Sequence, residues 1–235
     1  MNSTYRAQVV TPAEWEAARL RLLAREQELT RARDALAARH RRMPWLKADQ
    51  EYAFDGPNSA ARLLDLFEGS RQLLLSRAFF EPGVDGRPTT PASAARCRPA
   101  RSPISRISTP AFASRAPQPD IEQMAALMGW AMPWYTITDS FDADFGLAER
   151  YGTNAFFRDG DTIYRTYFAN DREHEPIGAI SGCLDFTALG RQEDWEDSPD
   201  GYPQVPRYSW LKRHDEYGPT GQAAITESAH HANHD

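Results

Sequence analysis

The sequence predicts an α/β fold, in which a central mixed sheet is flanked by helices and preceded by a long N-terminal helix. Three observations carry this prediction. The run Gln72 to Phe80 is almost continuously apolar, which is typical of a strand buried on both faces of a parallel sheet. Segments 153–158 and 162–169 flank Asp159-Gly160, a dipeptide that favours a tight β-hairpin. Several further stretches, the first of them near the N-terminus, carry apolar residues at helical spacing.

Residues 1–42 form an N-terminal helical extension in this interpretation. Thr11-Pro12-Ala13-Glu14 combines a capping hydroxyl, a proline at the first helical position and a nearby carboxylate, so a helix is expected from there to about Arg42. One face carries a narrow apolar seam with seven-residue spacing: Trp15, Leu22, Leu29 and Leu36. Two interpretations stay open: the helix docks along its own domain, or the seam forms a coiled coil that makes a homodimer.

The main domain is expected over residues 43–217. A short strand at 52–54 runs into the turn Asp55-Gly56-Pro57, and a brief helix from Arg62 to Phe67 stops at Gly69. The buried strand from Gln72 to Phe80 follows.

An irregular, basic and proline-rich insert is then expected at 87–119. It contains no Asp or Glu, and its prolines each fix φ and remove an amide donor, which excludes a helix or central strand. Two explanations of its composition stay open. One is a reading-frame shift over about 87–111 in a GC-rich gene, and the other is a genuine disordered linker.

The sheet is expected to resume after the insert. The spacing predicts a helix at 121–128, a strand within 130–137, a turn or short helix at 141–145, the hairpin, and a weaker helix at 177–185. Residues 193–217 are aromatic and proline-rich, which favours an irregular lid on the core. The polar tail 218–235 is expected to be disordered.

The composition excludes several classes of function. A net charge of -6 and a pI near 5.6 argue against a nucleic-acid binder. No apolar run reaches the length of a membrane span, and the N-terminus lacks the apolar core of a secretory signal, so we expect a cytoplasmic protein that does not enter membranes. No cofactor or metal ligand set is predicted. Asp139, Asp142 and Asp144 lack the spacing of a calcium loop and are interpreted as turn and capping carboxylates.

Several blocks of sequence occur in an order that resembles a known bacterial family. They are Glu28 to Asp34, Met43-Pro44-Trp45, Tyr52 to Pro57, Asp65-Leu66-Phe67, Met128-Gly129-Trp130, Met132 to Tyr135, Asp142 to Gly146 and His214 to Tyr217. They resemble the thioredoxin-like family known as domain of unknown function 899, and the similarity extends from Val10 to Tyr217 outside the insert. The order of the elements also resembles a thioredoxin-like sandwich with an N-terminal extension.

The resemblance implies a dithiol-disulfide oxidoreductase that acts on a protein thiol or disulfide partner. Members of the family often carry Cys-x-x-Cys after the buried strand, but this chain lacks that motif, since its two cysteines are Cys97 and Cys183. The cis-proline position of thioredoxins is occupied here by Gly152-Thr153.

Cys97 is the candidate catalytic residue, because the neighbouring Arg96 and Arg98 would favour its thiolate. The competing interpretation is an exposed thiol in an unstructured segment. Cys183 is interpreted as a small buried apolar residue. Two function hypotheses follow: a thiol-disulfide oxidoreductase without its dithiol, and a non-catalytic thioredoxin-fold module for binding or dimerisation.

Overall fold

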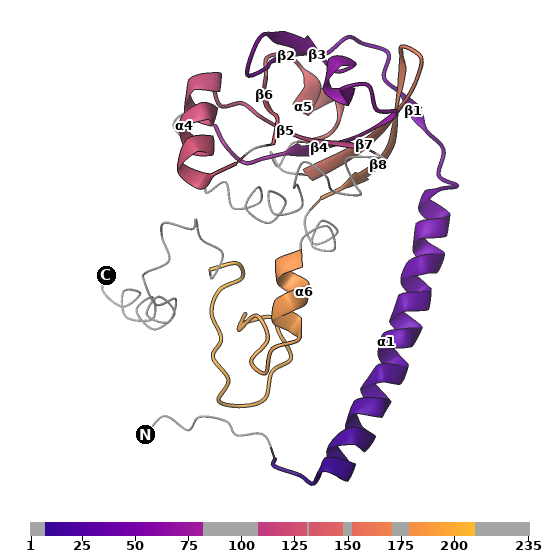
Figure 1. The fold of residues 1–235 in the computed structure, drawn as a ribbon, viewed down its shortest axis with the longest axis vertical. Coiled ribbons are helices and arrows are strands. Elements are labelled where there is room, and N and C mark those ends of the chain that lie inside the picture. Colours follow the sequence, from indigo (N-terminus) through magenta and orange to yellow (C-terminus); the bar gives the residue numbers. More distant parts are fainter. Residues whose placement is uncertain (1–7, 82–107, 131, 148–151, 171–178, 210–235) are drawn as a thin grey trace.

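The computed structural model describes residues 8–81, 108–130, 132–147, 152–170 and 179–209. It consists of a curled mixed sheet, small helices against the sheet, and one long N-terminal helix that extends away from it (Figure 1). The sheet has eight strands in the order β1-β8-β7-β4-β5-β6-β2-β3. The predicted α/β class and long first helix are therefore confirmed.

Helix α1 spans Pro12–His40, close to the predicted bounds. Its start is a complete capping box, because the Thr11 hydroxyl accepts a hydrogen bond from the Glu14 amide while the Glu14 carboxylate accepts one from the Thr11 amide. No described side chain of α1 is buried. The expectation that this helix docks along its own domain is therefore wrong for the described residues. Its aromatic contact with the sheet is at its C-terminal end, where the ring centroids of His40 and Tyr167 lie 4.2 Å apart with the rings tilted by 33°.

Three parallel strands form the centre of the sheet. They are β4 (Gln72–Arg77), β5 (Thr109–Ser114) and β6 (Trp134–Ile137). As predicted, β4 is the central buried strand, since it pairs with β5 on one side and with β7 on the other. It ends at Arg77, three residues before the predicted end.

The predicted bounds of the insert are wrong at the C-terminal end. Strand β5 and helix α4 (Gln118–Met128) both begin inside 87–119, and β5 contains Pro110. The ladder between β5 and β6 begins only at Phe112, whose amide donates to the Pro133 carbonyl. Alternate residues of a strand direct their amides to the same side, so the amide that Pro110 lacks would point toward β6 where that ladder has not started. A central strand therefore tolerates this proline.

The hairpin prediction is confirmed, with the turn shifted by one residue. Strands β7 (Gly152–Asp159) and β8 (Thr162–Ala169) are antiparallel, and Asp159 pairs with Thr162. The two loop residues are therefore Gly160 and Asp161, and Gly160 adopts a φ of 59°. Positive φ at this position is what a tight hairpin turn requires.

Short strands extend both edges of the sheet. β2 (Ala53–Asp55) pairs with β6, and β3 (Ala60–Arg62) pairs with β2. β1 (Leu46–Lys47), which was not predicted, pairs with β8 at the other edge. The predicted helix at 62–67 is reduced to the 3-10 turn η1 (Asp65–Phe67).

Each face of the sheet is covered by its own core. On one face α5 (Phe141–Asp144) and η1 cover an aromatic cluster that includes Tyr52, Phe54, Phe141, Phe145 and Phe156. On the other face α4 buries Ile121 against Phe112 and Trp134. The sheet is thus a middle layer between short helices, as Figure 1 shows.

The predicted lid was residues 193–217, and its described part, residues 193–209, does not cover the sheet. Helix α6 (Ala179–Asp185) and the irregular chain after it lie apart from the sheet in Figure 1. This segment is organised around Glu193, a fully buried carboxylate that accepts hydrogen bonds from the Trp195 indole and the Tyr208 amide. The tail 218–235 lies outside the described residues. Within the described part of the chain, no helix is both long enough and apolar enough to cross a bilayer.

Candidate functional site

The carboxyl ends of the three parallel strands β4, β5 and β6 lie on the same side of the sheet. We call this side the carboxyl edge; it is distinct from the edge strands β1 and β3. Ligands of open α/β sheets bind at this kind of edge. Three charged side chains meet here: Arg77 ends β4, Arg115 follows β5, and Asp142 lies in α5 just after β6. Because each follows a different strand, the sheet topology is what joins them.

Arg77 is the centre of this group and is only 1% exposed. Its Nε donates to Asp142 Oδ1 at 3.0 Å and its Nη2 to Asp142 Oδ2 at 3.1 Å, an arrangement that uses the planar fork of the guanidinium. Nη2 also donates to Glu81 at 2.5 Å, and Nη1 donates to the Ala78 carbonyl. Each of the three guanidinium nitrogens of this buried cation therefore donates to a carboxylate or a carbonyl, as burial of a charge requires.

Arg115 extends the network toward the surface. Its Nε donates to Asp142 Oδ2 at 3.0 Å and its Nη2 to the Asp139 carbonyl at 2.7 Å. The Arg115 side chain is 35% exposed, so the network runs from the core to solvent. With two guanidinium groups and the carboxylates of Asp142 and Glu81, its formal charges balance.

The neighbouring carboxylates are structural, as predicted. Asp139 accepts hydrogen bonds from the Phe141 amide at 3.0 Å and the Ala53 amide, so it caps α5 and ties it to β2. Asp144 accepts from the Ser140 hydroxyl at 2.6 Å. Among the described residues, no cluster of His, Cys, Asp and Glu side chains could hold a metal ion. The role of Asp142 as an ion-pair partner was not predicted.

Gly152 and Thr153 lie beside Arg77 on the adjacent strand, because Gly152 is the register partner of Arg77. Gly152 has a φ of 147°, and a Cβ there would lie 2.7 Å from Cε2 of Phe168. A larger residue is therefore excluded at this point of the carboxyl edge. The Thr153 and Ser76 hydroxyls are 2.8 Å apart and link β7 to β4.

Asn154 is a buried polar residue that sequence reasoning missed. It is 0% exposed, lies opposite Leu75 in the sheet, and neither its amide nitrogen nor its oxygen has a hydrogen-bond partner. A lone Asn within an apolar strand is the only signal in the sequence. For Arg77 the signal was a single cation near the end of an apolar run.

The two cysteines lie in different parts of the chain. Cys97, the predicted catalytic residue, lies outside the described residues, in segment 82–107 between β4 and β5. Cys183 lies in α6 and is exposed, so the prediction that it is buried is wrong. No described side chain of α6 belongs to either core, and the Cys183 thiol is in contact with water.

Apart from the carboxyl edge, a hollow of about 430 Å³ lies between the edge strands β1 and β3 of the curled sheet. Four of its charged side chains form two ion pairs: Lys47 lies 3.0 Å from Asp49, and Arg62 lies 3.6 Å from Glu51. Tyr52 forms part of its wall. Burial, and then the charge and hydrogen bond of Asp144, raise the pKa of Tyr52 to about 12.

This pKa predicts a loss of stability at high pH. The ordinary tyrosine pKa is 10.0, so between pH 10 and about 12 the unfolded chain loses the Tyr52 proton while the folded chain keeps it. Unfolding is therefore favoured progressively across that interval. We expect Tyr52→Phe to flatten this decline in urea denaturation curves measured from pH 9 upward. Tyr164→Phe in β8 controls for loss of a hydroxyl, and an equal flattening in both variants would contradict the prediction.

A family model described as "Bacterial protein of unknown function (DUF899)" matches residues 4–217. No curated protein matches the chain. Since the match covers most of the sequence, including every strand and helix described above, the chain belongs to this bacterial family of unknown function.

Proposed function

We propose that this protein is a thioredoxin-like thiol-disulfide exchange protein that acts through Cys97. The observation that carries the proposal is the order and direction of the central strands. Strands β6, β5 and β4 are parallel, and on the other side of β4 the sheet continues with the antiparallel hairpin β7-β8. This arrangement, with helices on both faces, supports the thioredoxin-like sandwich that the sequence resemblance implies.

The place of Cys97 in the sequence fits this function. The chain leaves β4 at the carboxyl edge, next to Arg77, and segment 82–107 follows before β5 begins at the opposite edge. Nearby cations favour the thiolate form of cysteine, and Arg96 and Arg98 flank Cys97 directly in the sequence.

The proposed chemistry is exchange with a single protein cysteine. The Cys97 thiolate attacks one sulfur of a partner disulfide, which forms a mixed disulfide and releases the other sulfur as a thiolate. An external thiol such as glutathione then attacks the mixed disulfide and frees Cys97. A second external thiol completes the reduction, so one partner disulfide becomes two thiols while two external thiols become one disulfide.

Insulin reduction with dithiothreitol tests this function. We expect the wild-type chain to accelerate the reaction and Cys97→Ser to return it to the rate without protein. Cys183→Ser is the matched control, because it removes an exposed thiol elsewhere and should keep full activity. If wild type and both variants all show the background rate, thiol exchange is excluded.

The second candidate is a non-catalytic module for binding or dimerisation. It is favoured by the exposed apolar side chains of α1, which contact neither core. Under this function the insulin assay shows no acceleration, while α1 is still needed for association.

A further inference from the structure

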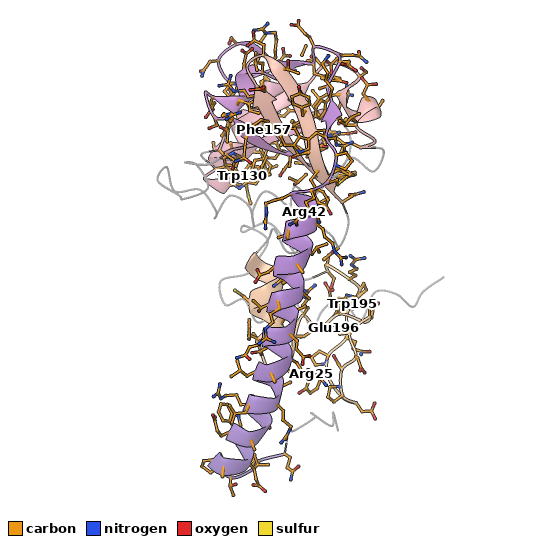
Figure 2. The ribbon with its side chains drawn as sticks, turned by 90° about the vertical axis from the view of Figure 1, so that its right-hand side faces the viewer. Arg25, Arg42, Trp130, Phe157, Trp195 and Glu196 are labelled. Carbon is orange, nitrogen blue, oxygen red and sulfur yellow. The ribbon has the colours of Figure 1, made fainter. Side chains whose placement is uncertain are left out.

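Helix α1 presents an apolar seam to solvent along almost its whole length. The seam consists of Trp15, Leu22, Leu29 and Leu36, which are 58%, 64%, 59% and 51% exposed. The helix has 29 residues and is about 43 Å long, and none of its described side chains is buried. Helices in proteins gain most of their stability from packing an apolar face against a partner, and this face has no partner within the described part of the chain. Figure 2 shows α1 extending away from the sheet, with Arg42 at the junction and Arg25 well below it.

The side chains beside the seam carry charges in a pattern that identifies a partner. One flank of the seam carries residues that directly precede a seam residue: Glu14, Arg21 and Glu28. The other flank carries residues four positions after a seam residue: Arg19, Glu26 and Arg33. In a parallel coiled coil, each residue of the first set faces the residue about five positions further along the second helix. The pairs are then Glu14 with Arg19, Arg21 with Glu26, and Glu28 with Arg33, and all three are opposite in charge.

The same pattern disfavours the antiparallel arrangement. With the two seams fully overlapped, Arg19 would face Arg33 of the second copy, while Glu26 and Glu28 would each face themselves. Like charges would therefore meet on both flanks, and flanking charges of this kind set the orientation of coiled coils.

The residues inside the seam permit close approach. Between the large side chains lie Ala18 and Ala32, which are small, and Arg25 and Arg39, which are charged. Arg25 donates to Glu28 of its own helix at 2.8 Å, and its side chain is 79% exposed. Its charge is thus held at the surface, and its aliphatic stem remains available to cover the neighbouring leucines.

We propose that α1 is a dimerisation helix, which pairs in parallel and in register with α1 of a second copy of this chain through Trp15, Leu22, Leu29 and Leu36. The two sheets then lie at the same end of the paired helices. This inference does not depend on thiol exchange, because α1 contributes no residue to the carboxyl edge.

The mass of the full-length chain in solution tests the dimer. Sedimentation velocity should give twice the 26.5 kDa chain mass for wild type. Leu22→Glu combined with Leu29→Glu should give the mass of one chain, while the sheet should still unfold cooperatively, because the seam packs on neither of its cores. Leu20→Glu is the matched control, since Leu20 is 51% exposed but lies away from the seam, and it should remain dimeric. A monomeric wild type, or a seam variant that stays dimeric, would overturn the proposal.

Cysteine cross-linking tests the orientation. The background carries Cys97→Ser and Cys183→Ser. In it, Ala32→Cys should form a disulfide between the two chains of the dimer under mild oxidation, because a parallel pair in register places position 32 of one chain opposite position 32 of the other. Ala24→Cys, on the outer face of the helix, should not. A dimer in which Ala32→Cys fails to cross-link would overturn the parallel arrangement.

Discussion

Replacing Arg77 by alanine is expected to lower the free energy of unfolding by about 3–5 kcal/mol, because it leaves Asp142 and Glu81 without their buried cation. The Arg77 side chain is 1% exposed and those of its two carboxylate partners are 14–15% exposed, so water screens these ion pairs weakly. The loss is measured by urea denaturation of the full chain.

An exposed ion pair supplies the control for Arg77. Arg71 lies 3.6 Å from Asp159, and both side chains are mostly exposed, so Arg71→Ala should cost about 0–1 kcal/mol. Asp142→Asn should also be costly, because Arg77 and Arg115 would then face each other without the carboxylate between them. An Arg77→Ala variant as stable as Arg71→Ala would show that the network does not hold the carboxyl edge together.

The second large effect is expected at Phe141, where alanine should lower the free energy of unfolding by about 3–5 kcal/mol. Phe141 is 0% exposed, and its ring lies 4.7–6.3 Å from the rings of four other aromatic residues: Tyr52, Phe54, Phe145 and Phe156. Its removal leaves a cavity under α5, a helix of a single turn that has no other fully buried side chain.

Phe186→Ala is the control for Phe141, because Phe186 is 86% exposed and should tolerate the change in thermal or urea unfolding. The Phe141 variant should also weaken the Arg77 network, since Asp142 is the next residue of α5. The double variant of Phe141 and Arg77 is therefore expected to lose less stability than the sum of the single losses. Strictly additive losses would contradict this coupling.

The sequence predicts correctly those elements whose formation depends on residues that are close together in the chain. The capping box of α1 needs only Thr11, Pro12 and Glu14, and the hairpin needs only its alternating strands and a glycine turn. The apolar run before the insert was sufficient to identify β4 as the central strand. In each case the determining interactions span a few residues, so the sequence pattern carries them directly.

The site depended on contacts that no local pattern encodes. Arg77 and Asp142 are 65 residues apart, and they meet only because β4 and β6 end at the same edge of the sheet. The sequence predicts no strand at Pro110, yet β5 contains it, because the late start of the β5-β6 ladder removes the need for its amide. Cys183 is of a residue type that is often buried, but it is exposed, and no described side chain of α6 belongs to either core.

The amino-acid sequence by itself determined the α/β class, the long capped helix and the hairpin, because periodicity, capping and turn chemistry act over short distances. It also determined the family, through blocks of similar sequence that the family model matches. Only the tertiary structure decided the strand order, the buried ion network at the carboxyl edge and the exposure of the α1 seam. The physical reason is that burial and charge pairing depend on which distant segments share a surface, and the folded sheet sets that relation.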